Sequence, residues 1–168
     1  REPLFKTRRL ISANDLKNFD REQAERYVDE VLALEEKLRD TNDKINKLDQ
    51  EETLIKPWIG YATPLEMKGT HKTIIHEGVV PTTVDMTEII NELEGIGGIV
   101  VKLINADKDL NYVAFICLRS KEEEIMSLLK QKGFSEVYFR HLKGTVAENV
   151  ERIKKEKEEL FAKVKDIE

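Results

Sequence analysis

The fold is decided by residues 20–57, which read DREQAERYVDEVLALEEKLRDTNDKINKLDQEETLIKP. Along this stretch, the positions of one helix face recur at alternating steps of three and four residues. That heptad spacing is typical of a helix packed along one partner helix. Nearly all intervening residues are charged or polar, so the apolar stripe is narrow and predicts a rod. The predicted seam of this first rod is Ala24, Tyr27, Val31, Leu34, Leu38, Thr41, Ile45, Leu48, Glu52 and Ile55.

Both ends of this rod carry sequence signals. Asp20 is a suitable N-cap, and Gln23 three residues later completes a capping box. Pro57 lacks a backbone N–H, so the helix is expected to end or kink there. At helical rise the rod would be about 55 Å long. The alternative is one helix of a compact bundle, although such helices usually have a wider apolar face.

A second helix with the same spacing is predicted at residues 145–168, where Thr145 and Glu148 form a capping box. We expect the two rods to fold back on one another as an antiparallel coiled-coil hairpin. The second rod would be only about 36 Å long. Part of the first seam, around residues 24–34, would then lack a partner, and we expect the parent protein to continue as helix. The second half of the seam is Val146, Val150, Ile153, Lys157, Leu160, Val164 and Ile167.

Between the rods the periodicity becomes that of an α+β domain, rich in β-branched runs and turn signals. The predicted strands are residues 73–80, 99–105, 112–118 and 137–142, and capping boxes at Asp85 with Glu88 and at Ser120 with Glu123 open the two predicted helices. The order β-α-β-β-α-β predicts a ferredoxin-like lobe at the tip of the hairpin, with both helices on one face of an antiparallel sheet.

These patterns divide the chain into five parts. They are a connector (residues 1–19), the first coiled-coil helix (20–57), a joint (58–72), the α/β lobe (73–142) and the second coiled-coil helix (145–168). In the joint, Trp58 and Tyr61 are large side chains suited to fastening a helix end to a domain. Nucleotide stacking is the alternative role for Trp58.

Composition excludes several classes of function. The net charge of −5 argues against a nucleic-acid surface, because phosphate binding needs clustered positive charge. Cys117 is the only cysteine, which excludes an intrachain disulfide. No apolar run approaches the ~20 residues that a membrane helix needs. Because the first residue is Arg1, we expect the sequence to be a piece of a longer protein.

No catalytic, cofactor or metal site is predicted. The histidines lack the spacing of metal ligands, and the glycines at residues 95–98 indicate a turn rather than a phosphate loop. The acids at residues 122–124 are explained by the dipole of the helix that they open. Cys117 lies in an apolar strand and is expected to be an inert core thiol. The three histidines are His71, His76 and His141.

Four segments carry a family resemblance: LIKPW (54–58), TPLEMKGTHK (63–72), HEGVVP (76–81) and LLKQKGFSEVYFRHLKGTVAENVERI (128–153). Taken in this order, they resemble the cytoplasmic region of subunit I of the V-type (A/V-type) ATP synthase, the prokaryotic counterpart of vacuolar ATPase subunit a. The resemblance extends from about Pro3 to the end of the chain.

The resemblance implies a distal lobe with its flanking helical arms, on the cytoplasmic side of the membrane. It implies a non-catalytic stator role, in which the lobe docks on the peripheral-stalk E and G subunits and resists the torque of the rotor. The other implied partners are the proximal lobe and the membrane domain of subunit I. No ion-translocating residue of the family has a counterpart in this sequence, and the transported ion and the direction of ATP chemistry stay open.

Two other classes share the predicted strand order. An ACT-like regulatory module would bind a small molecule, such as an amino acid, near the first strand–helix turn at residues 78–81. An RNA-recognition domain would need stacking aromatics on one sheet face. Tyr112 and Phe115 are instead predicted on opposite faces, and the chain is acidic.

Overall fold

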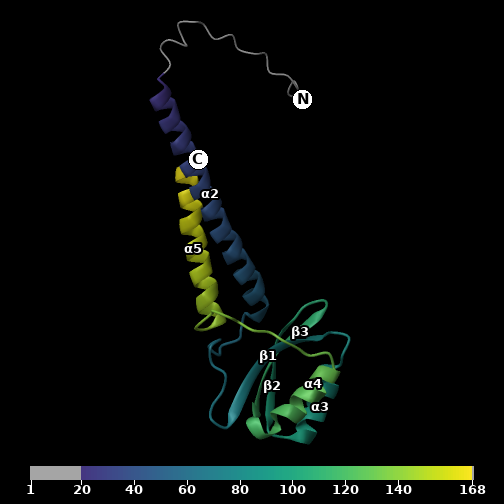
Figure 1. Ribbon diagram of the computed structural model, residues 1–168. Coiled ribbons are helices and arrows are strands. Elements are labelled where there is room, and N and C mark those ends of the chain that lie inside the picture. The colour runs from purple at the N-terminus through teal and green to yellow at the C-terminus, as the bar shows by residue number, and fades with distance from the viewer. Residues whose placement is uncertain (1–19, 168) are drawn as a thin grey trace, which may run out of the picture.

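The computed structural model describes residues 20–167, in which two long helices stand on a lobe of mixed helix and sheet (Figure 1). The α+β class is thus confirmed, whereas the predicted connector at residues 1–19 and the terminal Glu168 lie outside the described residues. The elements in chain order are α2 (Arg21–Ile55), a 3₁₀ turn (Lys56–Trp58), β1 (Thr73–Pro81), α3 (Met86–Ile96), β2 (Ile99–Ala106), β3 (Leu110–Leu118), a second 3₁₀ turn (Arg119–Lys121), α4 (Glu122–Gln131), β4 (Ser135–Glu136) and α5 (Val146–Ile167).

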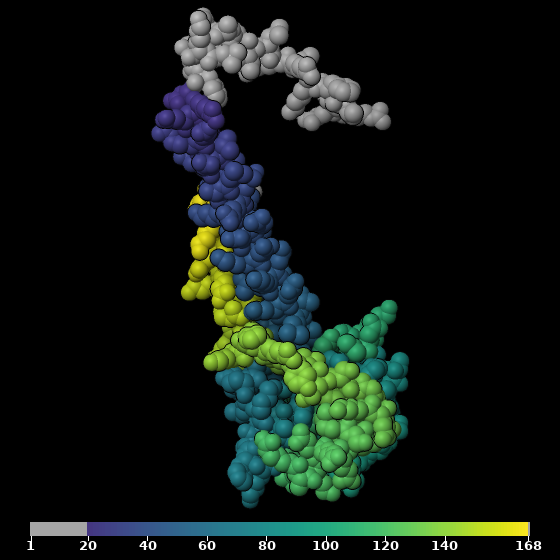
Figure 2. All heavy atoms as spheres, in the orientation of Figure 1, coloured from purple at the N-terminus to yellow at the C-terminus, as the bar shows by residue number. Residues whose placement is uncertain are grey.

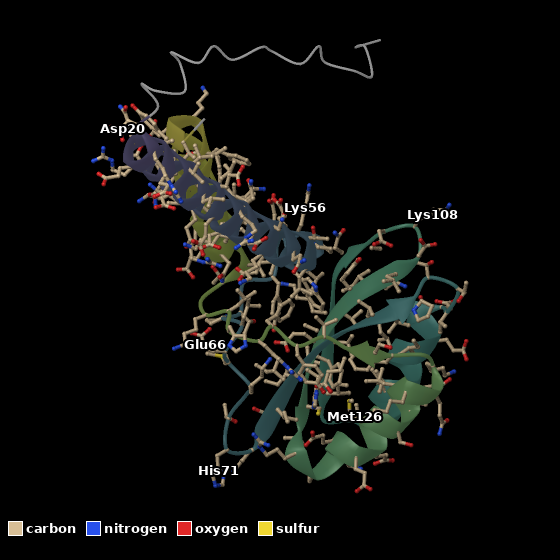
Figure 3. All side chains as sticks on the ribbon, turned by 45° about the horizontal axis from the view of Figure 1, so that its top comes forward. Asp20, Lys56, Glu66, His71, Lys108 and Met126 are labelled. Atoms are coloured by element: carbon tan, nitrogen blue, oxygen red, sulfur yellow. The ribbon has the colours of Figure 1, made fainter. Side chains whose placement is uncertain are left out.

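Local chemistry sets the ends of α2. The Gln23 backbone N–H donates to Asp20 Oδ1 at 3.1 Å, which satisfies one of the free N–H groups at the helix start. At the other end, Pro57 lies in the 3₁₀ turn that follows Ile55. Asp20 and Lys56 are labelled near the two ends of α2 in Figure 3, where His71 marks the end of the lobe far from the helices.

A complete capping box opens α5. Glu148 Oε2 accepts hydrogen bonds from the Thr145 backbone N–H at 2.7 Å and from its hydroxyl at 3.0 Å. The Glu148 N–H donates in return to Thr145 Oγ1 at 3.2 Å. These reciprocal bonds fix the point at which the chain leaves the lobe and turns into the second long helix.

The four strands form one antiparallel sheet in the order β2-β3-β1-β4. The central pair runs in register from Thr73 opposite Leu118 to Pro81 opposite Leu110. Helices α3 and α4 lie together on one face of this sheet (Figure 1). Because side chains alternate along a strand, each central strand contributes to two separate cores.

The first core lies between the sheet and α3 and α4. Val80, Val113, Phe115 and Cys117 point to this face and meet the apolar sides of the two helices. We call this face of the sheet the helix face. The second core lies on the opposite face, which we call the open face, where Ala114 meets the end of α2 and the joint (residues 58–72).

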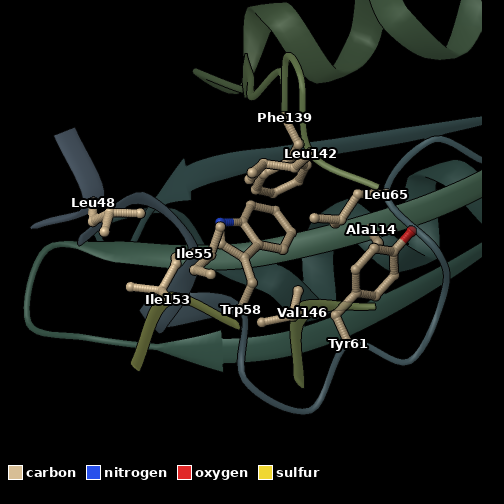
Figure 4. Packing of buried hydrophobic residues seen from close by; sticks show 10 residues of the cluster. All are labelled: Leu48, Ile55, Trp58, Tyr61, Leu65, Ala114, Phe139, Leu142, Val146 and Ile153. Atoms are coloured by element: carbon tan, nitrogen blue, oxygen red, sulfur yellow. The ribbon is translucent and has the colours of Figure 1, made fainter. Parts of the chain in front are cut away.

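The second core is built around Trp58, whose side chain is 1% exposed. Its ring makes edge contacts with Tyr112 and Phe139, with ring centroids 5.7 Å and 5.2 Å away. Figure 4 shows side chains from both long helices, the joint, β3 and the segment after β4 converging on this ring. The buried members of this Trp58 cluster are Leu48, Ile55, Trp58, Tyr61, Leu65, Ala114, Phe139, Leu142, Val146 and Ile153.

The last predicted strand, residues 137–142, is wrong in position, since β4 comprises only Ser135–Glu136. The Val137 N–H still donates to the Glu77 carbonyl at 2.8 Å, but the chain then leaves the sheet. Phe139 and Leu142 pack into the Trp58 cluster instead. Their apolar spacing, which suggested a strand, therefore comes from burial of an irregular segment.

The predicted capping box at Ser120 and Glu123 is also wrong. A 3₁₀ turn occupies Arg119–Lys121, and α4 begins at Glu122 without a side-chain cap. The start of β3 is two residues earlier than predicted, at Leu110. The turn before it is closed by Asp107 Oδ1, which accepts from the N–H groups of Asp109 at 2.9 Å and Leu110 at 2.8 Å.

We expect Trp58→Ala to lower the free energy of unfolding by about 3–5 kcal/mol, because it removes the centre of a core shared by the helices and the lobe. The matched control is Ile59→Ala, since the neighbouring Ile59 is 57% exposed and should cost less than about 1 kcal/mol. Urea unfolding of both variants provides the measurement. Equal losses would contradict the central role of Trp58.

The stabilising contribution of the Glu148 cap should depend on pH. Hydrogen bonds from the Thr145 N–H and then its hydroxyl lower the pKa of Glu148 below its ordinary value of 4.5. The contribution is therefore present above about pH 4.5 and is lost as the pH falls through the folded-state pKa. The melting temperature of wild type should exceed that of Glu148→Gln at pH 7, and this difference should shrink as the pH falls below about 4.5.

Thermal melts monitored by circular dichroism would test this prediction. Glu151→Gln is the control, because Glu151 is an exposed acid on the same helix, and its difference from wild type should not follow that pattern. A difference between wild type and Glu148→Gln that does not change as the pH is lowered from 7 would contradict the role of the ionised cap.

Candidate functional site: the paired helices and their joint

The two long helices lie side by side and run in opposite directions (Figures 1 and 2). Leu48 and Ile55 of α2 and Ile153 of α5 are buried in the Trp58 cluster, with Val150 and Leu160 packed against it. Further seam positions on α2 are buried at Thr41 and Ile45 and half-buried at Leu38. Val164 and Ile167, near the end of α5, are half-buried as well.

Three seam positions near the start of α2 do not pack against another helix among residues 20–167. Tyr27, Val31 and Leu34 are 59%, 54% and 46% exposed. Figure 2 shows the beginning of α2 projecting beyond the end of α5. We call this part of α2 the free stripe, and it comprises Tyr27, Val28, Val31, Leu32 and Leu34.

Ion pairs flank the packed half of the seam. Arg152 of α5 donates to Glu51 Oε2 at 2.8 Å, and Lys157 Nζ lies 2.6 Å from Asp49 Oδ1 and 2.9 Å from Glu52 Oε2. Hydrogen bonds to Asp49 and Glu52 raise the pKa of Lys157. Each partly exposed pair contributes at most about 1 kcal/mol. Because Glu52 and Lys157 both occupy seam positions, they form a polar layer that favours one alignment of the helices.

The joint is tied to the sheet by a buried carboxylate. The side chain of Glu77 on β1 is 2% exposed. It accepts a hydrogen bond from the Tyr61 hydroxyl at 3.0 Å, and Lys68 Nζ lies 2.9 Å from its second oxygen. Burial, followed by the charge of Glu77, raises the pKa of Tyr61. Both oxygens of the acid thus have partners, as a buried charge requires.

A second buried polar group, His76, lies on the helix face of β1. Its Nδ1 lies 2.6 Å from Glu136 Oε1 and its Nε2 lies 3.2 Å from Glu122 Oε1. Its ring stacks on Phe115 with centroids 5.1 Å apart. His76 therefore joins β4 and the start of α4 to the centre of the sheet. The alternation along β1 could have shown that this histidine faces the helices, but its two acidic partners are distant in sequence.

The other residues with side chains that could bind a metal or react are not brought together. His71 and His141 are exposed. Cys117 is buried in the first core, and burial, with the nearby charge of Glu122, raises the pKa of its thiol. Within residues 20–167, no three His, Cys, Asp or Glu side chains are grouped so that they could hold a metal ion.

None of the helices between residues 20 and 167 combines the length and the apolar character that a bilayer crossing requires. The candidate functional region consists of the helix pair, the Trp58 cluster and the surfaces around them.

Similarity to known proteins is found among solved structures. No family model matches the chain, and no curated protein matches it. Among solved structures, the crystal structure of the cytoplasmic N-terminal domain of subunit I, homolog of subunit a, of V-ATPase is similar, with a TM-score of 0.58 and 13% sequence identity. The two chains share a fold. The match covers 89% of this chain and 52% of the other, so this chain spans about half the length of that structure.

The packed and free parts of the seam should respond differently to the same substitution. Leu48 is 7% exposed and Leu34 is 46% exposed, and both lie on the α2 seam. Leu48→Ala should cost about 2–5 kcal/mol of unfolding free energy, whereas Leu34→Ala should change it by less than about 0.5 kcal/mol. Urea unfolding at equal protein concentrations is the measurement. A comparable loss in Leu34→Ala would show that the free stripe is covered in solution.

Proposed function

We propose that this chain is a non-catalytic stator segment of a rotary V-type ion-translocating ATPase or ATP synthase. Its role would be to link the membrane subunit to the peripheral stalk and to resist the torque of the rotor. The observation that carries the proposal is the Trp58 cluster, in which α2, α5 and the sheet share one core. The fold shared with the cytoplasmic domain of subunit I of V-ATPase supports the same assignment.

The mechanical argument starts from helix stiffness. A single exposed helix bends easily, and α2 alone would be about 52 Å long. Packing α5 along it resists bending, since bending would have to separate or compress the buried seam. A force applied to the lobe reaches both helices through the Trp58 cluster, because neither helix end can move without disturbing that core.

The proposal also includes a detailed arrangement of the fold. We infer an antiparallel coiled-coil hairpin made of residues 20–57 and 145–168, a joint at 58–72 and a ferredoxin-like lobe at 73–142. The strand order β2-β3-β1-β4 supports the ferredoxin-like type, and heptad-spaced burial on α2 supports the coiled coil.

The proposed partners follow from the same assignment. They are the peripheral-stalk E and G subunits, together with the proximal lobe and membrane domain of subunit I, and the segment would lie on the cytoplasmic side of the membrane. The free stripe suits a further helical partner, because its apolar residues continue the spacing of the packed seam.

The alternative of an ACT-like regulatory module gains no support from the described residues. A ligand near Gly78 would need space beside that strand. A Cβ atom placed at Gly78 would lie 2.3 Å from the Phe134 ring and 2.5 Å from the Ser135 carbonyl oxygen. The space is filled by the segment that leads into β4.

Isothermal titration calorimetry of the chain against a purified E–G complex would test the stator role. We expect a dissociation constant in the micromolar range, since in an assembly several weak contacts act together. An unrelated coiled-coil dimer of similar charge is the control. No heat of binding at high micromolar concentrations would contradict docking of this lobe on the stalk, and melting-temperature increases with a free amino acid would favour the regulatory alternative.

A further inference from the structure

The open face of the sheet is only partly covered by the joint. Around Ala114, it is buried in the Trp58 cluster. Farther from the helix pair, Ile75, Ile116 and Val100 form a row across β1, β3 and β2, because Ile116 pairs with both of the others in the sheet register. Val100 is 67% exposed and Ile116 is 37% exposed.

Leu118 extends this row toward the end of β3 and is 41% exposed. We call these four residues, Ile75, Val100, Ile116 and Leu118, the open-face patch. Beside it is a hollow of about 230 Å³, bounded by Tyr61 and Thr63 of the joint and by the row itself. The patch therefore has a recess that can admit aliphatic side chains.

The charges around the patch are basic, although the chain as a whole has a net charge of −5. Lys102 lies next to Val100 on the same face of β2. Lys72 and Arg119 form the next pair beyond Thr73 and Leu118 and alternate toward the helix face, with the Arg119 N–H donating to the Lys72 carbonyl at 3.0 Å. All three side chains are exposed. Among the open-face positions of β1, β2 and β3 the only acid is Glu77, and Lys68 already neutralises it.

This charge pattern selects between partners. Two copies of the chain packed face to face would bring their Lys102 side chains toward one another, and like charges at an interface are costly. A partner with acidic side chains would gain from the Lys102 charge. A helix is favoured over an added strand, because Lys102 and the irregularity between Leu103 and Asn105 on the edge strand β2 oppose strand addition.

We propose that the open-face patch is a docking site for an amphipathic helix of a partner protein, one that presents aliphatic side chains flanked by acidic ones. The helix lies across the three strands on the face opposite α3 and α4, with its apolar side in the hollow beside Tyr61. This surface is separate from the free stripe, and the proposal holds whether or not the chain belongs to a rotary ATPase.

The test uses the whole chain and three synthetic peptides. The first is a helix-stapled peptide with leucines at i, i+3, i+4 and i+7 and glutamates beside them. The second has lysines in place of the glutamates, and the third has the acidic composition in scrambled order. Fluorescence polarisation should show that the acidic amphipathic peptide binds at least about tenfold more tightly than either control.

Surface variants locate the binding site. Val100→Glu should weaken binding of the acidic peptide at least about tenfold. Lys102→Glu should weaken binding of the acidic peptide and improve binding of the lysine peptide. Leu103→Glu is the matched control, because Leu103 is a 49% exposed apolar residue on the same strand but faces the other side of the sheet. Circular dichroism would confirm that each variant is folded.

Three results would overturn the proposal. They are undetectable binding of the acidic peptide, equal binding of the acidic and lysine peptides, and unchanged binding in Val100→Glu. Sedimentation velocity of the chain alone tests whether a second copy of the chain occupies the patch instead. A dimer that dissociates in Val100→Glu would replace the proposed partner helix with a second copy of this chain.

Discussion

The packing of one indole ring determines how the parts of this molecule are held together. Trp58 lies three residues after the end of α2, yet the buried cluster around it includes Val146 and Ile153 of α5, Ala114 of β3 and Phe139 from the segment after β4. These groups are far apart in sequence and meet only around this side chain (Figure 4). Helix pair and lobe therefore share this core, whereas the core between the sheet and α3 and α4 belongs to the lobe alone.

The sequence predicted those features that rest on local periodicity. The α+β class, the sheet-forming segments β1 to β3, both ends of α2 and the start of α5 follow from spacing, capping residues and Pro57. The stretch around β4 could not be placed, since Phe139 and Leu142 have the spacing of a strand but bury their side chains in the Trp58 cluster. An apolar pattern indicates which side chains are buried. It does not indicate whether the backbone is paired in a sheet, because an irregular segment can bury the same side chains.

For a related reason, polar contacts between residues distant in sequence could not be predicted. His76 and Glu77 are adjacent and both buried, but they face opposite sides of the sheet and are satisfied by different partners. His76 contacts Glu136 and Glu122, whereas Glu77 contacts Tyr61 and Lys68. Alternation along β1 indicates which way each points. It does not indicate which distant side chains contact them. Likewise, the open-face patch could be identified only from the structure, which shows how much of the sheet the joint covers.

The charged layer inside the α2–α5 seam has a consequence for loads directed along the helix axes. Two aliphatic surfaces would slide past one another by a heptad at little cost, because each new layer would resemble the old one. Here such a slip would move the Lys157 ammonium away from Asp49 and Glu52, whose oxygens lie 2.6 Å and 2.9 Å from it. It would also place charged side chains next to the apolar residues Ile45 or Leu48. The ion pairs of Lys157 therefore favour the observed alignment of the two helices over one shifted by a heptad.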